Sequence, residues 1–427
     1  MRYVPANGDR SCFNYFIGMN LLFIHQNFPG QWKHLAPAMA ALSNYRAVAL
    51  AMHDRPIHAP GVEVRRYKAK RSSTPNIHPW SVDFESQMIR GESCAEACIQ
   101  LRDEGFMPHV ICAHPGWGEA LFLKDVWPNA KILGYHELHY HKDGSRFDRE
   151  FAAPFTWQEA CRIRTKNASF LLGYEDIDWG VTPTRFQWDT LPVRVQERTS
   201  IIHDGIDIEH VKPNPQSKLL IQSRNLTISR ENEVITFISR NLEPTRGFHR
   251  FMRALPQIQA NHPNAHIFIV GREGNGYGAA HPSGKSYKQV MLEELEGQLN
   301  LDQLHFLGPL PYGQLLKLLQ LSSIHIYFTI PFVLSWSLME AMACGALIIG
   351  SKTPPLEEVI QHGKNGLLVD YFQTSELVEA VKEVFQHRDR YESLRQAARQ
   401  TIVEHYDLRY SLRRQQALIL ALGAQVL

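Results

Sequence analysis

Short apolar runs alternate with longer stretches of helical period along most of the chain. The pattern starts near Met19 and repeats through the second half of the sequence. Strands separated by helices in this way are typical of parallel α/β layers, in which each strand is buried on both faces. The sequence therefore predicts an α/β protein with two doubly wound, Rossmann-like domains that face a cleft.

The predicted strands divide into two groups along the chain. They are "NLLFIHQ", "RAVALAM", "VEVRRYK", "HVICAH", "KILGYH", "WGVTPT" and "TSIIHDG" in the first half, then "VITFIS", "HIFIVG", "LHFLG", "IHIYFT", "ALIIGS" and "GLLVD" in the second. Helical stretches lie between them, including "FTWQEACRIRTKNASFLL", which is predicted as one long helix.

The predicted boundaries follow from these patterns. Residues 1–18 are expected to be a disordered extension, with the true start at Met19, because polar residues interrupt their apolar run and no cleavage site follows. Residues 19–208 are predicted to form the first domain and 209–405 the second, since "KPNPQSK" breaks regular structure between them. Residues 406–427 are predicted to be a helix that packs back on the first domain, because no strand follows it.

Composition describes an ordinary globular protein. The 427 residues are 44% hydrophobic and 21% charged, and the net charge of +2 does not argue for a nucleic-acid partner. The six cysteines are scattered, so we expect buried thiols in a reducing compartment and a cytoplasmic protein. The sequence contains no run of 18 apolar residues, so no membrane-spanning helix is predicted.

The stretch "PFVLSWSLMEAMACG" carries the most specific candidate chemistry. It follows the strand "IHIYFT", and a helix is predicted from about Leu338 to Cys344 with its start at the cleft. Unpaired amides at a helix start, together with the helix dipole, form an anion site. An alternative is that Ser337 and Glu340 form a capping box, in which Glu340 only reaches back to a backbone amide.

Two arginines are predicted to share this cleft. Arg240 and Arg246 lie in "SRNLEPTRGFHRF", where the second domain's first strand gives way to a helix. Guanidinium groups bind phosphate oxygens bidentately, and Gly247 follows directly. A surface role is the common explanation for one such arginine, but two at a single strand–helix turn favour a diphosphate clamp.

With these motifs, the second domain resembles the donor domain of retaining GT-B glycosyltransferases of family 4 (glycosyl transferases group 1). The family shows an Arg and, six residues on, a Lys-Gly, which here are Arg240 and Arg246-Gly247. "HFLGPLPYGQLLKLL", "LMEAMACGALIIGS" and "PPLEEVIQHGKNGLLV" match further family segments. The resemblance covers most of residues 19–400 and is looser in the first domain.

The resemblance implies a function and a set of roles. A sugar would pass from a nucleotide diphosphate sugar to an acceptor hydroxyl with retention, in polysaccharide or glycolipid assembly, without a metal or other cofactor. The second domain would bind the donor and the first the acceptor. Glu340 would bind the donor ribose, the amides of Ser335, Trp336 and Ser337 the diphosphate, and Leu310 the base. One departure is Phe332, which stands where the family commonly has an acid that contacts the donor sugar.

Two loops of the first domain match the family as well. Gly30 and His34 match its glycine loop and a helix-borne histidine. Gly30 is predicted to bind the donor, because a glycine lets the backbone approach a bound phosphate or sugar, although an ordinary strand–helix turn is the alternative. His136, at the end of "KILGYH", matches the family's cleft histidine and is predicted to be catalytic beside the reacting sugar. The dense "GYHELHYHKDG" also suggests a metal cluster, but its spacing is not a helical zinc motif, so no metal site is predicted.

Further expectations concern the acceptor and the place in the cell where the protein works. A glycan or a lipid-linked acceptor is expected, at the inner face of the membrane in the second case. The basic run "VRRYKAKR" is either a solvated strand end or an attraction to anionic lipid that would give peripheral membrane association. Two rival functions stay open: a sugar-nucleotide epimerase of the same fold, and a non-catalytic sugar-nucleotide-binding protein, which the replacement at Phe332 favours.

Overall fold

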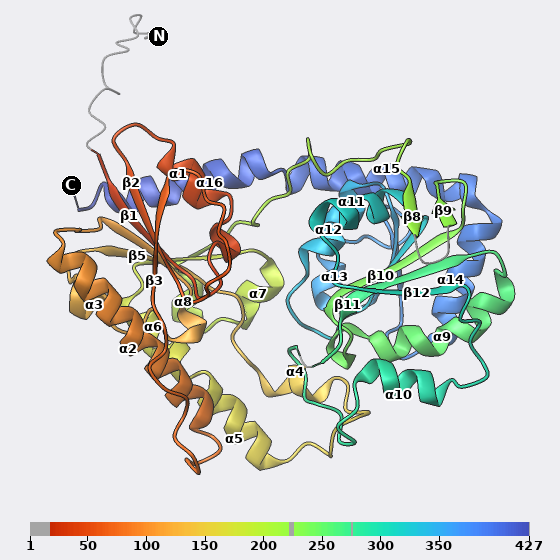
Figure 1. Cartoon of the computed structure of the whole chain (residues 1–427), viewed down its shortest axis with the longest axis horizontal. Helices are drawn as coiled ribbons and strands as arrows, with labels where there is room; N and C mark the ends of the chain where they lie inside the picture. Colours follow the sequence, from red (N-terminus) through yellow and green to blue (C-terminus); the bar gives the residue numbers. More distant parts are fainter. Residues whose placement is uncertain (1–17, 222–225, 275, 427) are drawn as a thin grey trace, which may run out of the picture.

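The computed structural model describes residues 18–221, 226–274 and 276–426. The predicted extension at residues 1–18 lies, apart from Gly18, outside the described residues. The predicted fold class is confirmed: two parallel sheets lie side by side, each covered by helices (Figure 1). We call the part with the first sheet the first domain and the part with the second sheet the second domain.

The seven-stranded sheet of the first domain has the order β3-β2-β1-β4-β5-β6-β7. Its strands are β1 (Asn20–Ile24), β2 (Arg46–Ala51), β3 (Val62–Arg66), β4 (Val110–Ala113), β5 (Lys131–Tyr135), β6 (Trp179–Thr182) and β7 (Thr199–Ile201). Alternate residues of β1 enter separate cores, with Leu22 on one face and Leu21 on the other. Both faces are buried because helices pack on each side of the sheet.

Helices connect these strands and cover both faces. They are η1 (Gly30–Trp32), α1 (Leu35–Ala40), α2 (Val82–Asp103), η2 (Pro115–Trp117), α3 (Leu123–Val126), α4 (Lys142–Arg146), α5 (Trp157–Lys166), α6 (Ala168–Asp176), α7 (Arg185–Thr190) and α8 (Val193–Gln196). The single long helix predicted over "FTWQEACRIRTKNASFLL" is wrong, because α5 and α6 are separated at Asn167. The Asn167 side chain hydrogen-bonds both the amide and the carbonyl of Tyr140, which holds a loop against the break.

The second sheet has six parallel strands in the order β12-β11-β10-β13-β14-β15. They are β10 (Val234–Asn241), β11 (His266–Arg272), β12 (Leu304–Gly308), β13 (Ile324–Tyr327), β14 (Leu347–Ser351) and β15 (Leu367–Val369). Its helices are η4 (Pro244–Arg246), α9 (Phe248–Asn261), α10 (Tyr287–Glu294), α11 (Tyr312–Leu321), α12 (Trp336–Ala343), α13 (Pro354–Glu357), α14 (Thr374–Gln386) and α15 (Arg388–His405). A small hairpin, β8 (Leu219–Ile221) with β9 (Leu226–Ile228), lies in the stretch expected to be irregular.

The last helix, α16 (Leu408–Gly423), returns to the first domain, as Figure 1 shows. Ile419 and Leu422 are buried in the same core as Met19. A Cβ at Gly423 would come within 2.3 Å of the Met19 sulfur, so the Met19 side chain would have to shift to accept any other residue here. We propose that the boundary between the two domains lies between residues 208 and 209.

Candidate functional site

A central cavity of about 190 Å³ lies between the two domains. It is placed where the carboxyl ends of parallel strands from both sheets meet, the usual ligand position in such folds. Side chains from both domains line it: Gln31, Tyr135, Glu137, Pro183, Thr184, Gln187, His203, Asp204, Arg240, Arg246, Tyr277, Val333, Leu334, Ser335 and Trp336.

Arg240 and Arg246 both line the central cavity. Arg246 is 5% exposed, and its Nη1 donates to the Tyr327 hydroxyl (3.3 Å), the Thr329 hydroxyl (3.1 Å) and the Val333 carbonyl (2.8 Å). Arg240 is exposed at the end of β10. Among the described residues neither guanidinium has a carboxylate at ion-pair distance. Two cations without an anion therefore face one cavity, which suits an anionic ligand.

A glycine-rich loop brings Tyr277 onto both arginines. The guanidinium carbons of Arg240 and Arg246 lie 5.7 and 5.6 Å from the centre of its ring. The loop is held by Glu243, a buried carboxylate that accepts hydrogen bonds from the amides of Gly276, Tyr277 and Gly278. The sequence gave no sign of the role of Glu243, because the two segments meet only in the fold.

The start of α12 lies at the central cavity, two residues earlier than predicted. Ser335 is its N-cap, and the Ser335 Oγ accepts a hydrogen bond from the Ser337 amide at 3.3 Å. The Ser335 amide donates to the Tyr327 hydroxyl at 2.7 Å. A diphosphate bound by these amides would replace both internal bonds, whereas the amide of Trp336 has no acceptor among the described residues.

Glu340 lies inside a smaller second cavity of about 90 Å³, which shares Gln31, Asp204 and Trp336 with the central cavity. The capping-box interpretation is wrong, because Glu340 accepts a hydrogen bond from the Tyr312 hydroxyl at 2.8 Å and Ser335 caps the helix. Burial raises the pKa of Glu340, and the Tyr312 bond opposes the rise. A buried carboxylate oxygen beside a cavity can accept hydrogen bonds from ligand hydroxyls.

Asp204 joins the domains between these two cavities. Its carboxylate accepts hydrogen bonds from the Tyr135 hydroxyl at 3.1 and 3.2 Å and from the indole Nε1 of Trp336 at 2.8 Å. Burial raises the pKa of Asp204 to about 6, against the lowering effect of these bonds. Sequence reasoning missed this residue, since nothing in its local segment shows that Trp336 lies opposite.

Gly30 and His34 are placed near the second cavity. Gly30 has a φ of +47°, and a Cβ there would come within 2.4 Å of the His25 ring. Packing alone therefore requires a glycine at this position, and donor binding by Gly30 stays a prediction. His34 lines the second cavity from the N-cap of α1, and burial lowers its pKa.

His136 is not brought to the cavities described above. It follows β5 with 1% exposure, and its ring packs edge-on to Tyr174, 5.0 Å between centroids. Gly180 leaves room for the ring, since a Cβ there would lie 2.4 Å from it. Burial lowers the pKa of His136 to about 3, so the ring is neutral at neutral pH. Its catalytic role stays a prediction that this arrangement does not support.

Leu310 and Phe332 lie outside the cavity linings. Leu310 is partly buried against the core that includes Leu338, and its contact with a base stays a prediction. The Phe332 ring packs against Tyr277, 4.9 Å between centroids, and lies 5.3 Å from the guanidinium carbon of Arg246. The position expected to hold an acid is thus part of an aromatic wall around Arg246.

A third cavity of about 260 Å³ belongs entirely to the first domain. It is lined by Asp83, Ser86, Gln87, Arg90, His114, Gly116, Trp117, Glu137, Leu138, Tyr140, Lys166 and Phe170. The Trp117 ring stacks on His114 with 4.1 Å between centroids. An aromatic face with surrounding polar groups is suited to a sugar-like ring.

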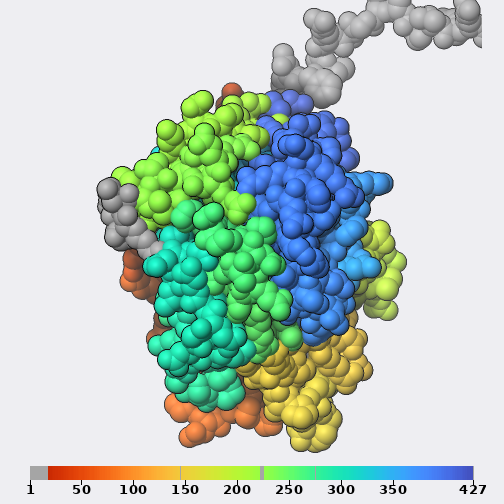
Figure 2. All heavy atoms as spheres, turned by 90° about the vertical axis from the view of Figure 1, so that its right-hand side faces the viewer, coloured from red at the N-terminus to blue at the C-terminus, as the bar shows by residue number. Residues whose placement is uncertain are grey.

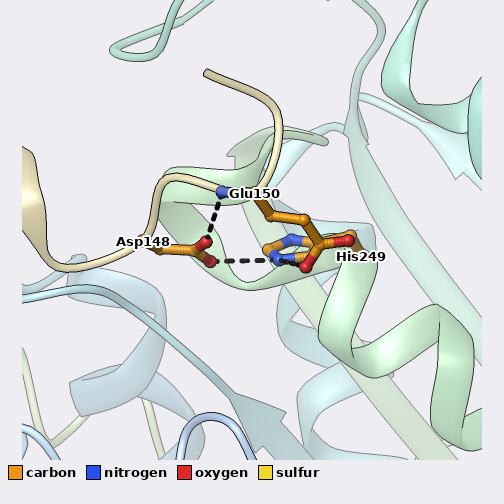
Figure 3. Close-up of side chains that lie close together, drawn as sticks. All are labelled: Asp148, Glu150 and His249. Atoms are coloured by element: carbon orange, nitrogen blue, oxygen red, sulfur yellow. Dashed lines mark hydrogen bonds and ion pairs between the residues drawn. The ribbon is translucent and has the colours of Figure 1, made fainter. Parts of the chain in front are cut away.

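One cluster in the described part of the chain, Asp148, Glu150 and His249, has the composition of a metal site (Figure 3). His249 Nε2 lies 3.0 Å from Asp148 Oδ2, and Arg250 Nη2 lies 2.9 Å from Glu150 Oε2. The Tyr371 hydroxyl also donates to Asp148 at 2.9 Å. Because a cation already pairs with these carboxylates, an ion-pair network explains the cluster, and metal independence of the protein stays a prediction.

This network fastens the first domain to the second. Residues 142–151, which we call the strap, leave the first domain and lie against α9 and against Tyr371 and Phe372, just before α14. In Figure 2 the gold segment, which includes the strap, borders green and blue parts of the second domain. Phe147 packs on Tyr371 at 5.2 Å between centroids, and Phe151 packs on His249, also at 5.2 Å. The strap therefore combines buried charge with aromatic packing.

The basic run at residues 65–71 is paired within the first domain. Arg65 contacts Glu63 and Glu104, Lys68 contacts Asp54, Lys70 contacts Glu96, and Arg71 contacts Glu85. Arg66 donates to the carbonyl of His53. The solvated strand end is therefore the interpretation that the contacts favour. No helix among the described residues is long and apolar enough to cross a membrane.

Two parallel α/β domains that face a cleft are the architecture of the GT-B fold. Solved structures with this architecture are similar to the chain. Anabaena HepE in complex with UDP and glucose superposes with a TM-score of 0.67 at 17% identity, over 94% of this chain and 99% of that one. Sucrose-phosphate synthase from Thermosynechococcus elongatus gives 0.69 at 16%, over 95% and 100%.

Sequence models place the chain within this class. The model for the glycosyl transferase family 4 group matches residues 43–211, and the model for glycosyl transferases group 1 matches residues 222–401. Together they span most of the chain, which therefore belongs to glycosyltransferase family 4, group 1. The resemblance of the motifs in the second domain is confirmed.

The curated relatives of the chain have low sequence identity to it. The D-inositol 3-phosphate glycosyltransferase of Corynebacterium jeikeium is 24% identical over 290 residues, 66% of this chain and 64% of the relative. A GDP-mannose-dependent alpha-(1-6)-phosphatidylinositol monomannoside mannosyltransferase of Mycobacterium tuberculosis is 24% identical over 212 residues, 47% of this chain and 50% of the relative. The matches span 56 to 64% of the length of the first curated relatives.

Proposed function

We propose that the protein transfers a sugar from a nucleotide diphosphate sugar to an acceptor hydroxyl, with retention at the anomeric carbon. The observation that carries the proposal is the pair Arg240 and Arg246, which face the central cavity without a carboxylate partner among the described residues. A departing nucleoside diphosphate gains negative charge in the transition state, and preorganised cations stabilise it there.

The donor would extend from these arginines along α12. The diphosphate would lie at Ser335, Trp336 and Ser337, and the ribose hydroxyls would donate to Glu340 in the second cavity. Tyr312, which now donates to Glu340, would compete with or join that contact. The reaction in this proposal needs no divalent metal, since the two guanidinium groups supply the positive charge.

The acceptor is proposed to be a glycan or a lipid-linked glycan, with the protein working in the cytoplasm. The support is that relatives are named for transfer to inositol phosphate and to a phosphatidylinositol mannoside. Peripheral association with the inner face of the membrane would require the basic run to exchange its internal ion pairs for anionic lipid. An epimerase or a non-catalytic binding protein is not favoured, as the relatives named here are transferases or synthases.

A transfer assay tests the proposed function. The protein would be incubated with UDP-, GDP- and ADP-sugars and a panel of polyol and glycan acceptors, and release of nucleoside diphosphate would be followed. Acceptor-dependent release, with a new glycoside whose anomeric coupling in proton NMR matches the donor, is the expected result. An altered free donor without a glycoside would establish an epimerase. Binding without turnover of any donor would establish a non-catalytic protein.

A further inference from the structure

The central and third cavities share a single lining residue among those described, Glu137. One cavity holds the arginines proposed to bind the donor diphosphate. The other lies within the first domain and has the Trp117 face. A group that borders both cavities is placed where a donor sugar and an acceptor would meet.

The Glu137 carboxylate is available for a ligand. Its side chain is 27% exposed, and no described residue donates a hydrogen bond to it. The other carboxylate lining the central cavity, Asp204, already accepts hydrogen bonds from Tyr135 and Trp336. Glu137 is thus the acid in the central cavity whose acceptor capacity is unused.

His114 lies beside this carboxylate. The His114 Nδ1 accepts a hydrogen bond from the Gly116 amide at 3.1 Å, so a neutral ring carries its proton on Nε2. That Nε2 is buried, makes no hydrogen bond and lies 3.4 Å from the Glu137 Oε2. The ring is 2% exposed and is held by the stacked Trp117. One carboxylate oxygen therefore faces His114, and the other is left for the cavities.

We propose that Glu137 is a further catalytic residue and that His114 is its positioning residue. The Glu137 carboxylate accepts a hydrogen bond from the acceptor hydroxyl and takes its proton as the hydroxyl oxygen bonds to the anomeric carbon of the donor sugar. The bond from that carbon to the diphosphate breaks in the same step, and the nucleoside diphosphate leaves with the bonding electrons. The inference rests on the proposed function and deepens it, because it assigns the third cavity to the acceptor. It also places a carboxylate at the reacting centre, where Phe332 stands in the position of the family's usual acid. A fixed hydrogen bond to the nucleophile holds it in attack geometry, an effect on the order of 100-fold in rate.

The test compares Glu137→Gln with a matched control, Glu175→Gln, which alters an exposed acid on α6 outside the cavities. Glu137→Gln should lower kcat about 100-fold, while the KM for the donor and the melting shift caused by UDP or GDP stay at wild-type values. Glu175→Gln should leave all three unchanged. A Glu137→Ala variant should regain rate on addition of formate, whose carboxylate fits the vacated space, whereas Glu137→Gln should not.

Two results would overturn the inference while leaving the proposed function intact: a kcat for Glu137→Gln within threefold of an active wild type, or an equal loss of nucleotide binding. A His114→Gln variant, checked for a wild-type melting temperature, should lower kcat about tenfold at constant donor KM. A wild-type protein that forms no glycoside from any donor would instead refute the proposed function, and this inference with it.

Discussion

Replacing Arg240 by alanine separates ligand binding from folding. Arg240 is exposed at the end of β10, and its recorded contacts are a 3.4 Å hydrogen bond to the Tyr277 hydroxyl and the adjacent ring. An exposed hydrogen bond of this length contributes little to stability. The variant should therefore keep the wild-type melting temperature within about one degree.

The expected effect on catalysis is much larger. A charge-assisted hydrogen bond to a phosphate oxygen contributes about 2 to 3 kcal/mol, which corresponds to a roughly 30- to 150-fold loss of kcat/KM for Arg240→Ala. Arg246→Ala should lose as much and also unfold more easily, because Tyr327, Thr329 and Val333 each lose a donor in a buried site.

The assay is steady-state release of nucleoside diphosphate, with melting temperatures measured on the same samples. Arg272→Ala is the matched control, since Arg272 is an exposed arginine at the end of the neighbouring strand β11 and lines none of the cavities described above. A kcat/KM for Arg240→Ala equal to that of the Arg272→Ala control would refute the diphosphate clamp.

Three further predictions concern the acids of the interdomain region. Glu340→Gln should weaken nucleotide binding about tenfold in calorimetry, while the affinity for inorganic phosphate stays unchanged. Equal weakening of the binding of both ligands would contradict a ribose contact. Asp148→Asn should lower the melting temperature and open the strap to trypsin, because it removes the buried carboxylate that contacts His249, Arg250 and the Tyr371 hydroxyl; a trypsin pattern like that of the wild type would contradict this role. The raised Asp204 pKa of about 6 means that the neutral form is favoured on folding, so the stabilisation it contributes is full at low pH and is lost as pH rises through 6. Asp204→Asn should remove this dependence, so that wild type loses stability relative to the variant between about pH 4 and 6. An equal pH dependence of stability in the two proteins would contradict this prediction.

The alternation of apolar and helical stretches was enough to place both sheets. Strands such as β1 and β4 are apolar on both faces, and a buried parallel strand leaves few other interpretations for such a run. The hairpin β8–β9 was not predicted, because each strand has three residues and most of them are partly or fully exposed. The start of α12 was misplaced by two residues because Ser335 and Ser337 are both good caps.

The site was predictable where its residues share one local segment. Arg240, Arg246 and Glu340 stand next to the strand ends that carry them, and the fold brings them to adjoining cavities. Glu243 and Asp204 were missed because their partners lie in distant segments. For Glu243 the separation is 33 to 35 residues, and Asp204 is 132 residues from Trp336. Contacts of this kind depend on the three-dimensional arrangement of the elements, and no local sequence pattern predicts them.

The most direct test of the donor cleft is a thermal-shift titration of the wild-type protein with UDP, GDP, ADP and CDP, each with and without EDTA. A ligand that binds only the folded state raises the melting temperature by mass action. We expect one nucleotide to raise it, equally in EDTA, and the rise to disappear in the Arg240→Ala, Arg246→Ala double variant. No rise with any nucleotide in well-folded protein, or a rise that EDTA abolishes, would contradict a metal-free donor site built on these two arginines.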